Sequence, residues 1–341
     1  MKDLGLSMYP LFQMILLLSE RNCEESTNLV IDWISFFGAD FQRINGEDLV
    51  SNGLVVNISG NGKAIFGTSN ESGFKTSNIK SVWFRRWRIP PMLRHAVLLN
   101  SIEYDAYRYL VSEFNALSAS FFAGISKRNW LNKPSDLTHN KIFVLTQASL
   151  VGLKIPETLI CQTKVELRAF HRKHSGIISK SIGDTTFFRS ENRTFSNYTV
   201  EITDKDIDSL EEHFYPSLFQ SKIDKQYELR IFYLDGDFHA MAIFSQGDRQ
   251  TEIDFRQYNT RRPNRCVPYN LPAQIKNLLT ALMKRLDMNC GSIDLVRDKK
   301  GNYNFLEVNP VGQFSMVSYP CNYHLERKVA QYLIKQAHER K

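Results

Sequence analysis

Apolar and polar residues follow two different spacings along the first fifty positions of this sequence. Residues 14–18 form an unbroken apolar run, residues 24–37 place apolar side chains on one helical face before Gly38, and residues 40–44 alternate. These spacings predict a buried strand, an amphipathic helix and a second strand. Because this order forms a crossover unit, we expect an open α/β sheet in the N-terminal part of the chain.

The pattern then predicts a hairpin, a further strand and a long helix. The hairpin covers residues 54–59 and 63–68, with the glycine-rich residues 60–62 as its turn. The strand leads into three arginines interleaved with two tryptophans at residues 83–88. These arginines hold carboxylates or stack on aromatic faces, or they belong to an ordinary amphipathic strand, and these interpretations stay open. A helix is expected over residues 102–122, which contain no proline.

Two alternating apolar runs, separated by a turn that ends at Gly301, predict another hairpin over residues 291–310. Glu307 and Asn309 are two positions apart, so they share one face of the second strand. Asp294 lies about as far before the turn as Glu307 lies after it, so a tight hairpin brings it near both. Three oxygen donors of this kind suit Mg²⁺. The alternative is a solvated strand face without a ligand.

A helix and a small strand-rich module are predicted between these regions. The helix covers residues 138–151 and is ended by Gly152. The module extends to about residue 214 and includes a helix (164–174), a strand (176–180), a polar stretch (189–197) and a second helix (204–214). Lys180 stands at the end of its strand, where it faces a cleft. The polar stretch fits a lid that closes over a ligand.

Charged pairs mark two further strands. Glu228 and Arg230 start a strand, where the simplest interpretation is a cross-strand ion pair. Asp254 and Arg256 are two residues apart on an expected strand and would share a face. Arg256 is then placed to grip a carboxylate, while Asp254 positions it or serves as a base. The remaining chain predicts a helix over residues 272–286 and a final helix over 322–337.

Composition narrows the class of protein. The formal net charge of +7 comes from scattered lysines and arginines, and the sequence has no zinc-finger or RNA-binding signature, so we expect no nucleic-acid partner. Five cysteines stand far apart without a Cys-x-x-Cys pair, which favours a reducing cytoplasm over a disulfide frame or zinc site. The apolar run at residues 14–18 is too short to span a bilayer, so no membrane association is expected.

The order of these motifs resembles that of the ATP-grasp carboxylate ligases. The resemblance implies an ATP-grasp α/β fold with three parts: an N-terminal open-sheet pre-ATP-grasp domain (1–125), a central lid module (126–217) and a C-terminal catalytic module (218–341). It also implies ATP and Mg²⁺ as cofactors. The matching metal ligands are Asp294, Glu307 and Asn309. The matching nucleotide contacts are Lys141, Lys180, Gln220, Lys222, Ile223 and Glu228, and Arg230 matches a residue that faces the phosphates or an acyl phosphate.

Within this superfamily, residues 82–86, 253–256 and 307–313 are most similar to the peptide-modifying ligases of the microviridin (graspetide) type, and among them to the maturases of grasp-with-spasm systems. The resemblance implies a ribosomally made precursor peptide with a leader, whose Asp or Glu side chains are activated and joined to Ser, Thr or Lys side chains. It also implies a radical-SAM SPASM protein as a partner enzyme. Arg230, Asp254 and Arg256 are then the candidate catalytic residues. A homodimer is left open.

Two alternatives accompany this interpretation. One is an ATP-grasp ligase that adds free amino acids to a protein or small acid, which would need a compact pocket with carboxylates for an ammonium group. The other is a peptide-binding relative without catalysis. The complete metal set and both phosphate lysines, Lys141 and Lys180, argue against the second alternative.

Overall fold

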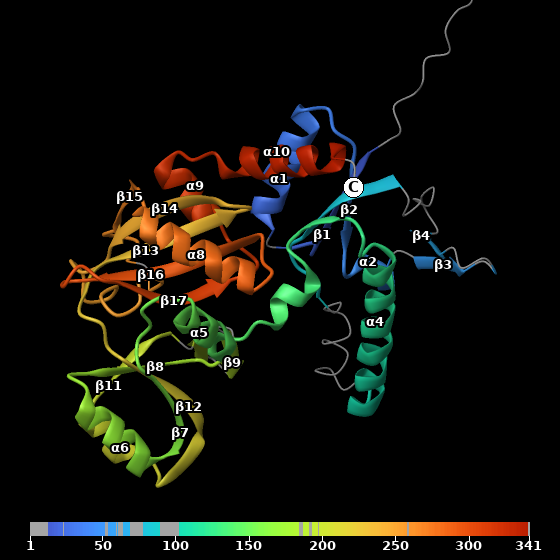
Figure 1. Ribbon diagram of the computed structural model, residues 1–341. Helices are drawn as coiled ribbons and strands as arrows, with labels where there is room; N and C mark the ends of the chain where they lie inside the picture. Colours follow the sequence, from blue (N-terminus) through green and yellow to red (C-terminus); the bar gives the residue numbers. More distant parts are fainter. Residues whose placement is uncertain are drawn as a thin grey trace, which may run out of the picture. The chain divides into compact units, whose positions relative to one another are not determined.

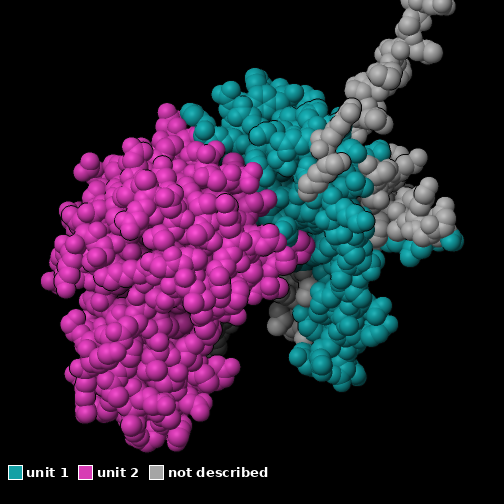
Figure 2. Space-filling model, in the orientation of Figure 1, with its two compact units in different colours: residues 1–133, 324–341 teal, residues 134–323 magenta. Residues whose placement is uncertain are grey.

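The structure is a computed structural model that describes residues 13–339, except 23, 52–53, 59, 61–63, 69–77, 89–101, 184–186, 191–192, 197 and 258. The chain forms two compact units (Figure 2). Unit 1 comprises Met1–Lys133 and His324–Lys341, and unit 2 comprises Pro134–Tyr323. The three-part division with boundaries after residues 125 and 217 stays a prediction.

Unit 1 is built on a parallel sheet with strand order β2-β1-β5-β6 (Figure 1). Its strands are β1 (Met14–Ser19), β2 (Phe41–Asn45), β5 (Ile79–Phe84) and β6 (Asn129–Leu131). An antiparallel hairpin of β3 (Leu54–Ile58) and β4 (Ala64–Thr68) accompanies it, and residues 61–62 of the predicted turn lie outside the described residues. The predicted open sheet is therefore confirmed.

The helices of unit 1 are α1 (Glu25–Phe36), α2 (Asp48–Ser51), α4 (Tyr104–Gly124) and α10 (Leu325–His338). Helix α4 packs on the sheet through Phe121, which joins Leu16, Val82 and Phe84 in one buried cluster. Helix α10 packs against α1 and β5. The last helix of the chain therefore completes the unit that the first strand begins.

The arginines that follow β5 are paired with carboxylates of the same unit. Arg85 and Arg86 both contact Glu24, and Arg88 Nε lies 2.6 Å from Glu20 Oε2. Glu20 and Glu24 are buried. Carboxylate contacts and aromatic stacking are therefore both seen: the carboxylates belong to this chain, and the Arg85 guanidinium lies 5.1 Å from the centre of the Trp83 ring.

Unit 2 contains a smaller antiparallel sheet of order β11-β8-β12-β7. Its strands are β7 (Thr158–Thr163), β8 (Ile177–Lys180), β11 (Val200–Ile202) and β12 (His213–Ser221); β9 (Phe187–Ser190) and β10 (Arg193–Ser196) form a separate hairpin, and the helices are α6 (Lys164–Lys173) and α7 (Asp204–Ser209). The helix predicted over residues 204–214 is wrong in its second half. Thr203 caps α7 as a capping box, but residues 213–221 pair with β7 and β8, because Phe219 and its neighbours complete the small core.

The larger antiparallel sheet of unit 2 has the order β15-β14-β13-β16-β17. Its strands are β13 (Lys225–Leu234), β14 (Asp237–Phe244), β15 (Arg265–Tyr269), β16 (Cys290–Asp298) and β17 (Tyr303–Asn309). Helices α5 (Lys141–Leu150) and α8 (Ala273–Arg285) pack on one face, where Leu145 and Leu279 meet Ile231 and Ile293 in the main core. The opposite face is left for polar side chains and for α9 (Ser315–Cys321).

Two predicted helix starts differ from the structure, and one helix was not predicted. Helix α5 starts at Lys141 because the Asn140 side chain caps it, and residues 134–138 form the separate 3₁₀ turn η2 (Pro134–Thr138). The final helix starts at Leu325, since the preceding Asn322 and His324 adopt positive φ angles. Helix α9 was not predicted, and Pro320 lies inside it. No helix among the described residues has the length and apolar character to cross a membrane.

Candidate functional site

The candidate site occupies the face of the large sheet that α5 and α8 leave uncovered. Along β13, Leu229 and Ile231 point into the main core, so Glu228 and Arg230 point to the opposite face. Asp294 on β16 stands directly opposite Arg230. Strand alternation therefore brings charged side chains from neighbouring strands onto one surface.

The predicted metal hairpin is present. Gly301 adopts a φ of 87° in its turn, Asp294 pairs with Glu307, and Ser292 pairs with Asn309 in the register of β16 and β17. A register shift follows Asp294, as expected for an added residue that turns a side chain toward a site. The structure therefore brings Asp294 beside Glu307, with Asn309 two pairs further along the same strand.

Asp294 is held by Arg230. The Nη1 atom of Arg230 donates to both carboxylate oxygens of Asp294 at 2.8 and 2.7 Å, and both side chains are largely buried. Burial raises the pKa of Asp294, while the Arg230 guanidinium opposes that rise and Glu307 adds to it. Sequence reasoning expected Arg230 to face a phosphate, whereas in this structure the guanidinium is engaged with the Asp294 carboxylate.

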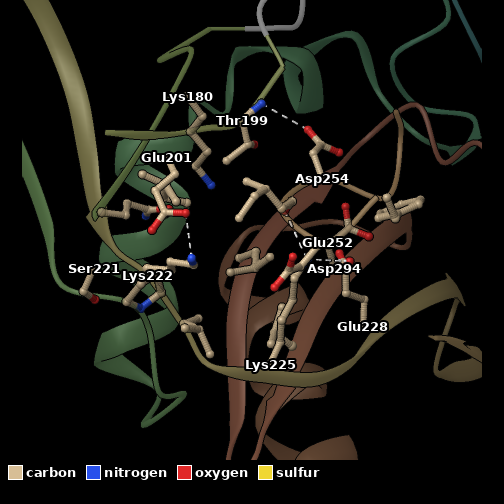
Figure 3. Close-up of a pocket in the computed structure, with 18 of the residues that line it drawn as sticks. Lys180, Thr199, Glu201, Ser221, Lys222, Lys225, Glu228, Glu252, Asp254 and Asp294 are labelled. Carbon is tan, nitrogen blue, oxygen red and sulfur yellow. Dashed lines mark hydrogen bonds and ion pairs between the residues drawn. The ribbon is translucent and has the colours of Figure 1, made fainter. Parts of the chain in front are cut away.

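A cavity of about 390 Å³ opens beside this pair (Figure 3). It lies between the smaller sheet, the segment that joins β12 to β13, the loop that joins β14 to β15, and strands β16 and β17. The charged residues of its lining are Lys180, Glu201, Lys222, Asp224, Lys225, Glu228, Glu252, Asp254, Arg256, Asp294 and Glu307. Nine of the twelve predicted site residues line this cavity; the exceptions are Lys141, Arg230 and Asn309.

Two lysines approach the carboxylates from the side of the smaller sheet. Lys180, at the end of β8, points into the cavity (Figure 3). Burial lowers the pKa of Lys180, and the nearby Glu307 carboxylate opposes that shift. Lys141 Nζ, at the start of α5, donates to the carbonyl oxygen of Gly183 at 2.7 Å and lies 3.9 Å from Glu307 Oε2. Both predicted phosphate lysines therefore lie near the predicted metal carboxylates.

The segment after β12 forms another wall of the cavity. Gln220 is buried, and its Nε2 donates to Thr158 Oγ1 at 2.9 Å. The Lys222 side chain bonds Glu201, and the Lys222 backbone N–H donates to Gly176 at 2.9 Å. The backbone N–H of Lys222 is thus already used within the protein, which leaves the Gln220 side chain and the neighbouring Ile223 as the better placed adenine contacts of the predicted set.

Glu228 is a buried carboxylate with internal partners. Its Oε1 accepts hydrogen bonds from Lys225 Nζ and Ser245 Oγ, both at 2.7 Å. Burial raises the pKa of Glu228, and Lys225 counteracts part of that rise. Lys225 Nζ also donates to the carbonyl oxygen of Ile253 at 3.1 Å. Lys225 therefore ties the start of β13 to the loop that carries Asp254.

Asp254 and Arg256 lie in a loop, so the strand predicted for them is wrong. Arg256 donates to Asp254 from its backbone N–H at 3.0 Å and from its guanidinium at 2.9 and 2.6 Å. These local bonds favour a turn over an extended strand. Thr199 N–H adds a bond to Asp254 Oδ2 at 3.1 Å. Burial opposes ionisation of Asp254, but the bonds from Arg256 outweigh it and hold the pKa of this carboxyl below its usual range.

The donor set fits a hard divalent cation. Asp294 and Glu307 supply two carboxylates and Asn309 an amide oxygen, which is the chemistry that Mg²⁺ accepts, with water and phosphate oxygens completing its shell. Among the described residues, no group of three or more His, Cys, Asp or Glu side chains is arranged to hold a metal ion. A metal here would therefore depend on two carboxylates and on ligands that do not come from acidic side chains.

The cavity also fits a nucleotide. Gln220 Oε1 is buried and has no hydrogen-bond partner among the described residues, so the cavity wall offers one acceptor to an incoming N–H donor. Lys141 and Lys180 supply positive charge near Glu307. A buried acceptor and two cations around one cavity match the base and the phosphates of a nucleotide.

Comparison with known proteins adds to this geometry. No family model matches the sequence, and neither does any curated protein. Solved structures do match. The macrocyclase MdnC bound with precursor peptide MdnA, from Microcystis aeruginosa MRC, is 25% identical, with a TM-score of 0.79 over 94% of this chain and 99% of that chain.

A RiPP-associated ATP-grasp ligase from Chryseobacterium gregarium, in complex with ADP and a leader and core peptide, is 21% identical, with a TM-score of 0.81 over 95% of this chain and 97% of that chain. The ATP-grasp ligase PsnB, complexed with a minimal precursor, Mg and ADP, is 16% identical, with a TM-score of 0.75 over 99% of both chains. The chain has the ATP-grasp fold. The fold and the resemblance expected from the sequence are both confirmed.

Sequence reasoning missed two contributors to the candidate site. Lys225 was not singled out, because residues three apart on a regular strand point to opposite faces; the register shift between Lys225 and Tyr227 brings Lys225 to Glu228. Thr199 acts through its backbone N–H, which carries no sequence signal. Lys225 contacts Glu228 and Thr199 contacts Asp254, and both of these carboxylates were predicted. The two additional residues therefore extend the site without changing its location.

Proposed function

We propose that this ATP-grasp ligase uses ATP and Mg²⁺ to activate Asp or Glu side chains of a ribosomally made precursor peptide as acyl phosphates. Ser, Thr or Lys side chains of the same peptide then form ester or amide links, which close rings. Support comes from the structures that the chain resembles, whose descriptions include a macrocyclase with its precursor peptide, and ligases with ADP, Mg and peptides.

The observation that carries the proposal is the pairing of charges across one cavity. Lys180 and Arg256 line the same cavity as Asp294 and Glu307. Activation of a carboxylate by ATP brings two anions together, so it needs cations around the phosphates and a further cation on the carboxylate. The cavity supplies both kinds of group at separate positions.

Each residue has a role in this scheme. Asp294, Glu307 and Asn309 would hold Mg²⁺, which neutralises charge on the nucleotide phosphates when bound. Lys141 and Lys180 donate to phosphate oxygens. Arg256 binds the peptide carboxylate by two parallel hydrogen bonds and orients it toward the γ-phosphorus.

The reaction then proceeds in two displacements. A carboxylate oxygen of the peptide attacks the γ-phosphorus, and the bond from phosphorus to ADP breaks. A hydroxyl or amine attacks the carbonyl carbon of the acyl phosphate, phosphate leaves, and the proton passes to the departing phosphate. Asp254 already accepts bonds from Thr199 and Arg256 on both oxygens, and its pKa is low, so we assign it to holding Arg256 in preference to serving as a base.

Further parts of the proposal concern partners and location. The precursor carries a leader segment, a radical-SAM SPASM protein is the partner enzyme, and the protein acts in the cytoplasm. The proposal leaves the homodimer open. The alternative substrate, a free amino acid, would need carboxylates placed for its ammonium group, and most carboxylates of this cavity already have cationic partners.

Co-expression with the small acidic, Ser-, Thr- and Lys-containing peptides encoded beside this protein tests the proposal. We expect mass spectrometry to show the loss of one water per link, dependent on the intact enzyme. Hydroxylamine should cleave ester links and leave amide links intact. Peptides that stay at full mass with the wild-type enzyme, or that lose water equally with an Asp294→Asn variant, would overturn the proposal.

A further inference from the structure

A second hollow lies on the same face of the large sheet. It has a volume of about 460 Å³ and runs between β14, the start of β15 and α9. Its lining residues are Met241, Ile243, Phe255, Pro263, Asn264, Cys266, Ser315, Met316, Tyr319 and Pro320. Most of these side chains are apolar, and Tyr319 is 60% exposed at the surface of the groove.

Strand register places this groove next to the site. Ile243 pairs with Glu228 and Met241 pairs with Arg230 across β13 and β14, so all four side chains lie on one face. Cys266 extends the same row onto β15, where it pairs with Ile243. The groove is therefore the continuation of the surface that carries Asp294.

One residue belongs to both hollows. Phe255 is 8% exposed and lines the groove as well as the cavity of the candidate site. Its neighbours in the chain are Asp254 and Arg256. We assign Arg256 to the peptide carboxylate and Asp254 to holding Arg256. A group bound in the groove would therefore press on the loop that positions Arg256.

The distance between the groove and Asp294 limits which residue of a bound peptide could occupy the groove. Neighbouring strands lie about 4.8 Å apart, so β14 is about 10 Å from β16, on which Asp294 stands. An extended peptide spans about 3.4 Å per residue. A peptide whose carboxyl reaches the candidate site would thus place a residue three or four positions away at the groove.

The charged side chains beside the groove indicate which residues flank the bound residue in the peptide. Arg261 and Arg262 are exposed and directly precede Pro263 of the groove wall, and the Arg256 side chain is 39% exposed on the same connection. Asp248, which Arg262 influences, is the nearby carboxylate, and it is bonded to Asn259. Asp254 already pairs with Arg256, and Glu252 of the same connection lines the other cavity, so Arg261 and Arg262 remain beside the groove with Asp248. This local excess of positive charge favours an acidic segment.

We propose that the groove binds an apolar side chain of the peptide substrate, three or four residues from the activated carboxyl, within a segment rich in Asp and Glu. This inference rests on the proposed function, since it takes the substrate to be a peptide. The apolar side chain supplies affinity by burial, and the arginines select the acidic surroundings.

Cys266 provides a native reporter for the groove. It is half-buried, whereas Cys161, Cys290 and Cys321 are buried thiols. Burial raises the pKa of the Cys266 thiol, so alkylation by iodoacetamide should be followed at mildly alkaline pH by peptide-level mass spectrometry. The probes are two short synthetic peptides of Asp, Glu and Ser that differ only in carrying one central Phe or one central Ser.

We expect the Phe peptide to slow alkylation of Cys266 several-fold more than the Ser peptide. Tyr319→Ser should raise the concentration of Phe peptide needed to protect Cys266 about tenfold, as expected for the loss of buried aromatic contact. Tyr215→Ser, at a tyrosine that is 87% exposed on β12, is the matched control and should change nothing. Equal protection by both peptides would overturn the proposal.

A parallel measurement separates the two proposals. Calorimetry of ATP binding with and without Mg²⁺ tests the nucleotide site and needs no peptide. If Mg²⁺-dependent ATP binding is present but Cys266 is protected equally by both peptides, the groove assignment alone is wrong. If the Phe peptide protects Cys266 but ATP does not bind, the proposed function is wrong and the peptide surface stands.

Discussion

Arg230 and Asp294 face each other across β13 and β16, and one guanidinium nitrogen of Arg230 lies within 2.8 Å of both carboxylate oxygens of Asp294. The pair is largely buried, so each charge depends on the other. A metal ion at Asp294 would share that carboxylate with Arg230. Asp294, the predicted metal ligand, is therefore already held in position by hydrogen bonds from the Arg230 guanidinium.

Asp294→Ala should destabilise the protein, because it leaves the buried Arg230 without its carboxylate partner. We expect a loss of roughly 3 kcal/mol in the free energy of unfolding, measured by urea denaturation. Adding Arg230→Met should restore most of that stability, since it removes the unpaired charge, and should not restore Mg²⁺-dependent ATP binding. Equal stability of the wild type and the single variant would contradict the dependence of each charge on the other.

Glu307→Gln should lower the rate of peptide-dependent ADP release by about a hundredfold, because it removes a carboxylate beside Lys180 and Asp294. A coupled assay of ADP release measures this rate. Glu212→Gln is the matched control, since Glu212 is 73% exposed and does not line the cavity. A Glu307→Gln enzyme within twofold of the wild type would remove Glu307 from the metal set.

Arg256→Lys should raise the KM for peptide about tenfold and leave the KM for ATP unchanged, because lysine keeps the charge but not the paired hydrogen bonds. Asp254→Asn should have a similar effect through Arg256. In a double-mutant cycle the two changes should then be far from additive. Additive effects would show that Asp254 acts by itself, as a base would.

The turn of the metal hairpin should show a pH-dependent stability. Burial opposes ionisation of Asp298, but hydrogen bonds from Asn302 outweigh it and lower the pKa from 3.8 to about 2. A lowered pKa stabilises the folded state above the unfolded-state value and loses that contribution as pH falls toward the folded-state value.

Asp298→Asn should therefore cost roughly 1–2 kcal/mol of unfolding free energy at neutral pH, and the difference from the wild type should shrink between about pH 4 and pH 2. Urea denaturation over this range measures it. Asp224→Asn is the control, because Asp224 is 74% exposed and pairs with the exposed Lys299. A pH-independent difference would refute the assignment of the stabilisation to the ionised Asp298.

The features that local pattern determines were predictable. The hairpin with Gly301, and with it the pairing of Asp294 and Glu307, follows from alternation and turn chemistry within twenty residues. Helix α7 begins where its Thr203 cap predicts. Each of these depends on neighbours in the sequence.

Features that depend on distant partners were not predictable. The bond between Arg230 and Asp294 needs a strand register across 64 positions, and Lys225 reaches Ile253 across 28. The alternation of Ile253 and Phe255 favoured a strand, but the backbone bonds of Asp254 produced a turn. The predicted helix extended to residue 214, but pairing with β7 places His213 and Phe214 at the start of strand β12.

The placement of α10 has a consequence for biosynthesis. Trp33 of α1 stacks beneath the guanidinium of Arg327, at 5.5 Å from its ring centre, within a unit that joins residues 1–133 to residues 324–341. A ribosome must therefore make all of unit 2 before helix α10 can pack on the strands of unit 1. The unit whose strands are synthesised first is thus the last to be completed.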